Sequence, residues 1–245
     1  MRAAVLVPAA GLGVRLGGGL PKALRELGDV PMLVHALRSV LAAPSVTAAV
    51  VAAPADGVED VRALLARELG PEAPVTVVPG GATRQESVRC ALDGLGAPFP
   101  VVLVHDAARP FVPVDVVESV VAAVEAGADA VVPALPVVDT VKEVTAEGAP
   151  DGTKERVVRT VDRASLRAVQ TPQGFRREVL AAAHAASPGG DTTDDAGMVE
   201  RMGVTVAVVP GSEDAFKVTR PFDLLLAEAL LNRRRAEAGS AEEPG

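Results

Sequence analysis

A glycine-rich stretch near the amino terminus has the residue types for binding phosphate. It runs from Pro8 to Leu24, reads PAAGLGVRLGGGLPKAL, and carries two cations, Arg15 and Lys22. Gly11 and Gly13 permit positive φ angles and a close approach of backbone to ligand, so several N–H groups can point at one anion. The apolar run before it predicts a short buried strand that ends in this turn. We therefore predict a phosphate-binding loop. The alternative is a glycine turn with two solvated cations.

Two better-known glycine loops do not fit this spacing. The dinucleotide-binding pattern would place its third glycine at position 16, where the chain has Leu16. The Walker pattern needs Gly-Lys-Ser or Gly-Lys-Thr, whereas Lys22 follows a proline. A Rossmann dehydrogenase is therefore disfavoured. A catalytically silent nucleotide-binding module is disfavoured because Arg15 and Lys22 are both present.

Further polar residues stand at the ends of predicted strands and helices. Gly80 and Gly81 lie between a strand and a helix, either as an ordinary turn or with N–H groups that face a ligand. Asp106 follows a buried strand, where ligands bind in open α/β sheets, so it could hold a ribose hydroxyl or a metal ion. His105 has no orienting partner in sequence, and we expect a structural role. Thr193 precedes a predicted helix, and its hydroxyl either caps that helix or binds substrate.

The pattern P-A-A-G-x-G-x-R, followed by L-P-K and later by H-D-A-A-R-P, resembles a known family. This is the 2-C-methyl-D-erythritol 4-phosphate cytidylyltransferase family, within the nucleotide-diphospho-sugar transferases. The resemblance covers nearly the whole chain. It implies that the loop wraps the triphosphate of CTP while Arg15 and Lys22 stabilise the transition state. It also implies that backbone groups near Gly81, with Ser87, read the cytosine base; Ala82 stands where family members often carry a polar residue.

The same resemblance assigns the remaining site residues. The nucleotide-binding residues would be Pro8, Ala9, Ala10, Gly11, Gly13, Gly80, Gly81, Ser87, Asp106 and Ala107. The residues that bind the polyol phosphate would be Asp106, Arg109, Thr140, Arg163, Thr171, Thr193, Lys217 and Thr219. Arg163 and Lys217 would join Arg15 and Lys22 in catalysis. Thr140 and Arg163 would reach the site of a neighbouring subunit. Mg²⁺ would be the cofactor, held by the CTP phosphates with Asp106 as a candidate direct ligand.

The chemistry suits residues of this kind. A phosphate monoester has a second pKa of about 6, so near neutral pH it attacks as a dianion and needs no general base. The enzyme must hold two anions in line and neutralise the charge that grows on the leaving pyrophosphate. The family resemblance implies that this reaction joins CTP and 2-C-methyl-D-erythritol 4-phosphate in the non-mevalonate isoprenoid pathway. A ribitol-5-phosphate cytidylyltransferase is the close alternative.

Apolar runs and amphipathic patterns alternate along the chain, and they predict the elements that position these residues. Strands are expected at 3–7, 46–53, 75–78, 101–104, 130–132 and 204–209, and helices at 33–41, 58–69, 87–95, 114–126, 176–185, 194–202 and 223–236. This rhythm predicts an α/β fold with a mostly parallel, Rossmann-like sheet covered by helices on both faces. We expect a single nucleotidyltransferase domain over 1–236 and a disordered tail at 237–245.

The segment 136–163 breaks this rhythm. Apolar and polar residues alternate around a turn-rich centre that contains Asp151 and Gly152, which predicts a protruding β-hairpin arm. Such an arm has little apolar area of its own and needs a surface to pack against. We therefore expect a homodimer that forms through the arm.

Composition limits the partners and the compartment. The 245 residues are 49% hydrophobic with a formal net charge of −8, which suits a packed core and leaves no basic surface for nucleic acid. Cys90 is the single cysteine, so an intrachain disulfide and a cysteine-based zinc site are excluded, as suits a reducing cytosol. Neither a signal peptide nor a membrane-spanning apolar run is apparent. We expect a soluble, cytoplasmic protein with no membrane partner.

Overall fold

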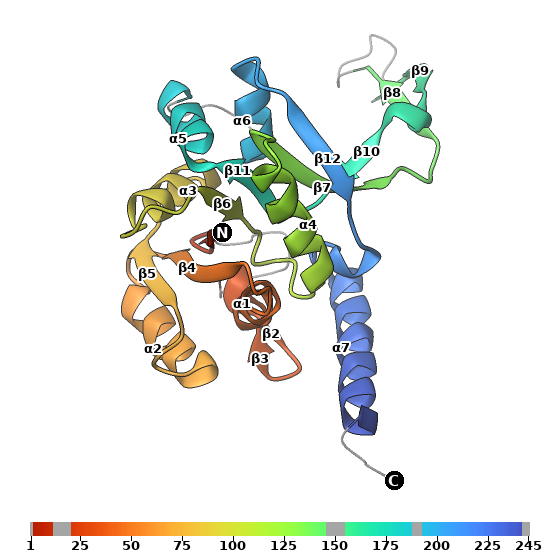
Figure 1. Cartoon of the computed structure of the whole chain (residues 1–245). Coiled ribbons are helices and arrows are strands. Elements are labelled where there is room, and N and C mark those ends of the chain that lie inside the picture. Colours follow the sequence, from red (N-terminus) through yellow and green to blue (C-terminus); the bar gives the residue numbers. More distant parts are fainter. Residues whose placement is uncertain (1, 12–20, 146–154, 188–192, 242–245) are drawn as a thin grey trace.

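A mostly parallel sheet of eight strands forms the centre of the computed structural model (Figure 1), which describes residues 2–11, 21–145, 155–187 and 193–241. The parallel strands are β1 (Ala3–Pro8), β4 (Val46–Ala53), β5 (Val75–Pro79), β6 (Val101–Val104), β7 (Ala130–Pro136) and β12 (Val206–Pro210). Two antiparallel strands that the sequence did not predict, β10 (Arg167–Val169) and β11 (Gln173–Arg176), pair with β7. Strand β11 also pairs with β6 and so joins the two halves of the sheet. The predicted fold class is confirmed.

Helices cover both faces of this sheet because the strands are apolar on both sides. One face carries α1 (Met32–Leu41), α2 (Val58–Leu69) and α4 (Val114–Glu125), and the other carries α3 (Arg84–Asp93), α5 (Arg177–Ala186) and α6 (Asp195–Arg201). Along β1, Val5 and Val7 are buried with the first group of helices, whereas Ala4 and Leu6 are buried with the second. This burial on both faces is typical of a parallel sheet.

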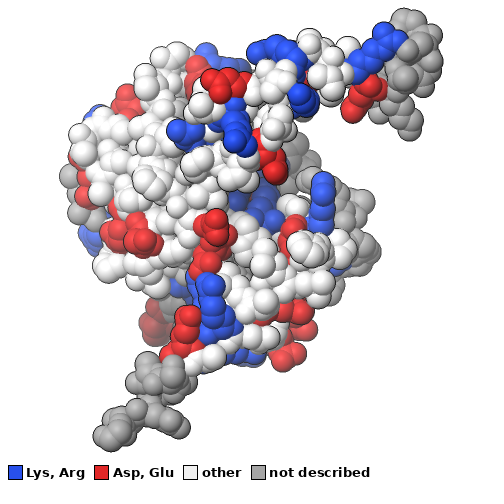
Figure 2. All heavy atoms as spheres, turned by 90° about the vertical axis from the view of Figure 1, so that its right-hand side faces the viewer, with Lys and Arg blue, Asp and Glu red and all other residues white. Residues whose placement is uncertain are grey.

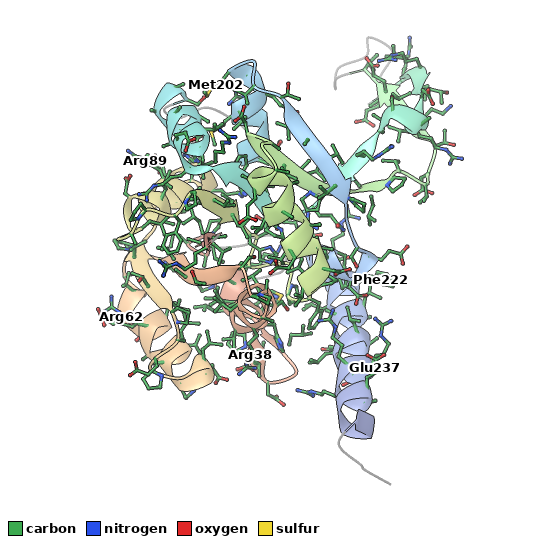
Figure 3. All side chains as sticks on the ribbon, in the orientation of Figure 1. Arg38, Arg62, Arg89, Met202, Phe222 and Glu237 are labelled. Atoms are coloured by element: carbon green, nitrogen blue, oxygen red, sulfur yellow. The ribbon has the colours of Figure 1, made fainter. Side chains whose placement is uncertain are left out.

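A third, smaller core lies beside the sheet, under the last helix α7 (Pro221–Ala241). Figure 3 labels Phe222 and Glu237 near the two ends of this helix. Its buried face packs on the short hairpin of β2 (Glu26–Leu27) and β3 (Val30–Pro31). Gly28 and Asp29 both have positive φ, 57° and 65°, as a two-residue hairpin turn of this twist requires. The hairpin follows the 3-10 turn η2 (Lys22–Leu24), so α7 supports the chain next to the phosphate-binding loop.

The predicted arm is a two-stranded antiparallel hairpin of β8 (Val141–Val144) and β9 (Val157–Val161). It leaves the sheet at the end of β7, returns through the 3-10 turn η3 (Arg163–Ser165) and β10, and projects from the body at the upper right of Figure 1. Its predicted central turn lies outside the described residues. Val157 is 61% exposed and Val158 is 56% exposed, so the arm presents apolar side chains that its own chain does not cover. The homodimer stays a prediction.

Two helix boundaries, the start of α3 and the end of α7, differ from the prediction by three residues or more. Helix α3 begins at Arg84 and not at Ser87, because Thr83 and Glu86 form a capping box at its start. Helix α7 continues to Ala241, so the predicted tail at 237–245 begins as helix, and residues 242–245 lie outside the described chain. Among the helices described, none is both long and apolar enough to span a membrane.

Candidate active site

Three loops meet where the order of the strands reverses. Strand β1 has β4 and then β5 on one side, and β6 on the other. The loops after β1, β5 and β6 therefore open at the same edge of the sheet, beside the point at which neighbouring connections diverge. Open α/β sheets bind their ligands at this position. These loops carry Pro8–Gly11, Gly80–Gly81 and His105–Asp106.

A cavity of about 270 Å³ lies between these loops. Eight of its lining residues belong to the predicted nucleotide-binding set: Pro8, Ala9, Ala10, Gly11, Gly81, Ser87, Asp106 and Ala107. Lys22 and Lys217 line the same cavity, so the structure brings two of the predicted catalytic cations together from distant parts of the chain. Gly13 and Arg15 lie outside the described residues. Figure 2 shows Lys and Arg side chains in a hollow below the arm.

The turn after β5 is held rigid by the first residues of α3. The backbone N–H of Gly81 donates to Ser87 Oγ at 3.2 Å, and that hydroxyl donates to the Thr83 carbonyl at 2.9 Å. The Glu86 carboxylate accepts from the N–H of Ala82 at 2.7 Å. Gly80 is not among the cavity's lining residues, but a Cβ atom there would lie 2.7 Å from the Cβ of Ala10. Glycine at position 80 therefore lets the two loops pack closely.

Asp106 is paired with two cations. Its Oδ1 accepts from Arg84 Nε at 3.3 Å, and its Oδ2 lies 2.6 Å from Lys217 Nζ. Burial alone would raise the pKa of this carboxyl, but Arg84 and Lys217 lower it well below its usual range. Asp106 is therefore a carboxylate at any physiological pH, and it fixes both cations at the cavity wall.

His105 supports Asp106 through Thr171, which agrees with the structural role expected of this histidine. The ring is fully buried, with Nε2 at 3.1 Å from the Arg109 carbonyl and Nδ1 at 3.1 Å from Thr171 Oγ1. The same hydroxyl oxygen accepts from the Asp106 N–H at 3.0 Å. Burial lowers the pKa of His105 to about 4, so the ring is neutral near pH 7. Thr171, predicted to bind substrate, also orients Asp106.

A second cavity of about 240 Å³ adjoins the first. Three residues line both cavities: Arg84, Asp106 and Lys217. Of the predicted polyol-phosphate residues, Arg109, Thr171 and Thr193 also line the second cavity. The Arg109 guanidinium is largely used internally, since it donates to the carbonyls of Ala215 at 2.6 Å and Val169 at 3.3 Å.

The alternative N-cap role of Thr193 is wrong. The N-cap of α6 is Asp194, whose carboxylate accepts from the Gly197 N–H at 3.0 Å. The exposed Thr193 instead lies at the second cavity, where a hydroxyl can meet a ligand.

Three predicted substrate residues are not brought to either cavity within the described chain. Thr140 and Arg163 are exposed on the arm, and Arg163 donates to the Val138 carbonyl. That position leaves their predicted role in a neighbouring subunit's site untested. Thr219 instead bonds through its hydroxyl to the Asp223 carboxylate, at 2.8 Å, at the start of α7.

Sequence reasoning gave no role to Arg84, which lines both cavities. One signal was available: Thr83-x-x-Glu86 is a capping-box pattern, and it would have placed Arg84 at the first position of a helix that begins in the site. Its second partner, Asp195, is 111 residues away and had no such signal.

The chain from Ala3 to Arg233 matches the family model described as 2-C-methyl-D-erythritol 4-phosphate cytidylyltransferase. The chain belongs to the 2-C-methyl-D-erythritol 4-phosphate cytidylyltransferase family. A cytidylyltransferase of that name from Streptomyces coelicolor is 58% identical over 239 residues, covering 97% of this chain and 88% of the relative. One from Saccharopolyspora erythraea is 52% identical over 234 residues, which cover 94% of this chain and 100% of the relative.

Solved cytidylyltransferase structures share the fold. The crystal structure of the enzyme from Thermus thermophilus is 38% identical with a TM-score of 0.71, covering 94% of this chain and 98% of that one. The 4-diphosphocytidyl-2C-methyl-D-erythritol synthase from Anaerococcus prevotii is 25% identical with a TM-score of 0.77 over 94% and 98%. The family resemblance predicted from the loop motifs is confirmed.

Proposed function

We propose that this chain is a cytidylyltransferase that joins CTP and 2-C-methyl-D-erythritol 4-phosphate. The products are 4-diphosphocytidyl-2-C-methyl-D-erythritol and pyrophosphate, in the non-mevalonate isoprenoid pathway. One observation carries the proposal beyond the family match: two adjoining cavities meet at Asp106 and Lys217. A cavity pair with a shared cationic wall suits a reaction between two phosphorylated substrates.

The nucleotide fits the first cavity. Backbone N–H groups in the loop after β1 suit its phosphates, and the turn at Gly81, held by Ser87, suits the edge of a pyrimidine. Lys22 suits the triphosphate because it follows that loop and lines the same cavity. A positive charge held there stabilises the pyrophosphate as it leaves. Arg15 belongs to the same step by its place in the motif.

The polyol phosphate fits the second cavity. Lys217 reaches that cavity from the loop before α7, and Asp106 fixes its ammonium group. The attacking phosphate oxygen forms a bond to the α-phosphorus of CTP, and the bond to the bridging oxygen breaks. Pyrophosphate takes that electron pair. A dianionic monoester needs no base for this step, which suits a site whose histidine, His105, is buried and neutral.

Mg²⁺ is proposed as the cofactor, bound chiefly through the CTP phosphates. Asp106 is the one carboxylate in the described lining of the first cavity, and both of its oxygens already face cations. Among the described residues, no group of three or more His, Cys, Asp or Glu side chains could hold a metal ion. Mg²⁺ commonly uses one or two carboxylates together with substrate phosphates, so Asp106 could serve as a single additional ligand.

The choice of substrate is tested by steady-state kinetics. Pyrophosphate release is followed with CTP and either 2-C-methyl-D-erythritol 4-phosphate or ribitol 5-phosphate, and then with ATP and GTP in place of CTP. We expect the methylerythritol substrate to have the higher kcat/KM by about tenfold or more, since small structural differences have that effect in a shaped pocket. Faster turnover of ribitol 5-phosphate would favour the alternative enzyme. Comparable rates with all three nucleotides would contradict base reading at Gly81.

We also propose a homodimer in which Thr140 and Arg163 of the arm act in the partner's site. The exposed valines of the arm support this, because a two-stranded hairpin needs a surface to pack on. Mixing Lys22→Ala chains with Arg163→Ala chains tests it. With random re-pairing about half of the dimers are mixed and hold one intact site, so recovery approaches roughly a quarter of wild-type activity. No recovery after confirmed re-pairing would mean that Arg163 does not act in the partner's site.

The cytoplasmic location stays a prediction.

A further inference from the structure

Arg84 stands in the wall between the two cavities, although no sequence motif gave it a role. It is the first residue of α3 and lines both cavities, together with Asp106 and Lys217. Its Nε donates to Asp106 at 3.3 Å and its Nη1 donates to Asp195 Oδ2 at 2.6 Å. No residue in the described part of the chain accepts from its Nη2, and the side chain is 30% exposed. Three of the five N–H donors of this planar cation, two on Nη2 and one on Nη1, therefore remain for a ligand.

A buried chain of side chains from α5 and α6 holds this guanidinium. Asp195 is the first residue of α6 and has no exposed surface. Its Oδ1 lies 3.1 Å from Nε2 of the buried His184 on α5. A carboxylate can only accept, so Nε2 carries the proton, and the lack of a partner for His184 Nδ1 among the described residues fits that tautomer. Three helices thus fix the direction in which Arg84 points.

The charges leave Arg84 as a permanent cation. Burial alone would lower the pKa of the Arg84 guanidinium, but Asp195 and Asp106 raise it above its ordinary value. Arg84 and Lys217 share Asp106, and the buried Asp195 pairs with Arg84 as well, so two cations face two carboxylates. A phosphate that arrives where the cavities join can accept from N–H groups of both cations.

The reaction brings two phosphoryl groups together at this boundary. An attacking atom must lie about 3–3.5 Å from the atom that it attacks, so the polyol phosphate and the α-phosphate of CTP must meet where the cavities join. Of the residues that line both cavities, Arg84 and Lys217 are the cations. Arg84 offers a fixed planar fork, which suits two phosphate oxygens better than a flexible ammonium group does.

We propose that Arg84 is a catalytic residue whose guanidinium binds the attacking phosphate and aligns it with the α-phosphate, and that Asp195 and His184 are its positioning residues. The inference rests on the proposed function for the identity of the substrates. The phosphate oxygen bonds to the α-phosphorus while pyrophosphate leaves with the electron pair, and Arg84 keeps its proton throughout.

The test compares Arg84→Gln with Arg89→Gln, which removes the same charge from a position on the same helix outside both cavities (Figure 3). For Arg84→Gln we expect kcat with CTP and 2-C-methyl-D-erythritol 4-phosphate to fall on the order of 10²-fold, by analogy with loss of a preorganised donor. The affinity for CTP alone should change by less than about threefold, because the proposed contact is with the other substrate. Arg89→Gln should match the wild type in both measurements.

Chemical rescue separates a catalytic cation from a purely structural one. Methylguanidine added to Arg84→Ala should restore kcat in a saturable manner, because the cavity left beside Asp195 accepts a free guanidinium. His184→Leu replaces the ring by an apolar side chain and so removes the donor to Asp195. For this variant we expect a higher KM for the polyol phosphate, an unchanged KM for CTP and no rescue. His184→Gln, which keeps an N–H donor, should behave more like the wild type than His184→Leu.

The outcomes are distinct. Absence of wild-type turnover would overturn both the proposed function and this inference, whereas wild-type turnover with an Arg84→Gln kcat within about threefold of normal would overturn the inference alone. Should Arg84→Gln not fold, Arg84→Lys carries the same test. It keeps a charge against Asp195 but cannot also reach the phosphate in bidentate fashion, so at least a tenfold lower kcat is expected on the order-of-magnitude scale for such contacts. An unchanged kcat in that variant would overturn the proposal.

Discussion

Gly81→Ala should lower both the free energy of unfolding and the affinity for CTP, and the two effects can be measured separately. A Cβ atom at this position would lie 2.3 Å from the Glu86 Cβ and 2.9 Å from its Oε2, far inside normal contact distance. Glu86 must then move, and its carboxylate leaves the N–H groups of Ala82 and Thr83 that it caps at 2.7 and 3.2 Å. Overpacking costs about 1–3 kcal/mol and a lost cap costs about 1 kcal/mol, so we expect a loss of about 2–4 kcal/mol in the free energy of unfolding.

The same change should also weaken CTP binding in the variant that remains folded, because the displaced turn lines the nucleotide cavity. Urea unfolding gives the stability change, and calorimetric titration of the folded variant gives CTP affinity. We expect binding of CTP to weaken by about tenfold or more, as when a polar contact to a substrate is lost. Gly96→Ala is the matched control, since nothing lies within 4 Å of a Cβ atom there. Equal CTP affinity in wild type and a folded Gly81→Ala would refute base reading by this turn.

Three further predictions follow from the site and its supports. Lys22→Ala should lower kcat on the order of 10²-fold with little effect on CTP affinity, and an equal loss of affinity at unchanged kcat would contradict its catalytic role. His105 has a pKa of about 4 in the folded chain against an ordinary value of 6.5, so acid favours the unfolded chain, and stability present above pH 6.5 should fall by about 2 kcal/mol by pH 5. Urea unfolding at both pH values should show a smaller fall for His105→Gln, and an equal fall would refute the assignment. Leu231→Ala should destabilise by about 2–4 kcal/mol in the same assay, because this side chain is only 8% exposed in the core under α7; a change below about 1 kcal/mol would mean that α7 adds little to that core.

The elements that sequence patterns placed well are those whose local signal agrees with their final environment. Strand β6 is a continuous apolar run that is buried on both faces, and β4 is apolar and largely buried except at Thr47. Helix α2 is amphipathic with Val61 and Leu65 on its buried side. The predicted bounds of these three elements agree with the structure. Strand β11 has the short mixed sequence Gln-Gly-Phe-Arg and gains its conformation from pairing with β6 and β7. Its burial between two strands decides its structure, and a local pattern cannot carry that information.

In the candidate active site too, the residues with a local sequence signal were predicted, and the contacts between distant segments were not. Motifs of glycine, lysine and aspartate predicted most of the first cavity, since each group of residues is contiguous and ends a strand. What sequence could not supply was the pairing of Arg84 with Asp195 and of Asp106 with Lys217, which join segments more than 100 residues apart. These two ion pairs determine where the charged groups of Arg84, Asp106 and Lys217 lie in the walls of the two cavities. The fold, and not the motif, therefore decides the electrostatics of the site.

The small core beneath α7 explains how two cations on separate loops keep a fixed distance. Leu27 lies shortly after Lys22, Val218 follows Lys217, and both side chains are buried against Leu231 and its neighbours on α7. The Val218 N–H also donates to the Ala108 carbonyl at 2.8 Å, which ties the Lys217 loop to the loop of Asp106. A core of this kind transmits displacement because packed side chains leave little room for adjustment. Loss of packing at Leu231 should therefore move both lysines relative to Asp106, and the catalytic defect of Leu231→Ala should appear in kcat even where the chain remains folded.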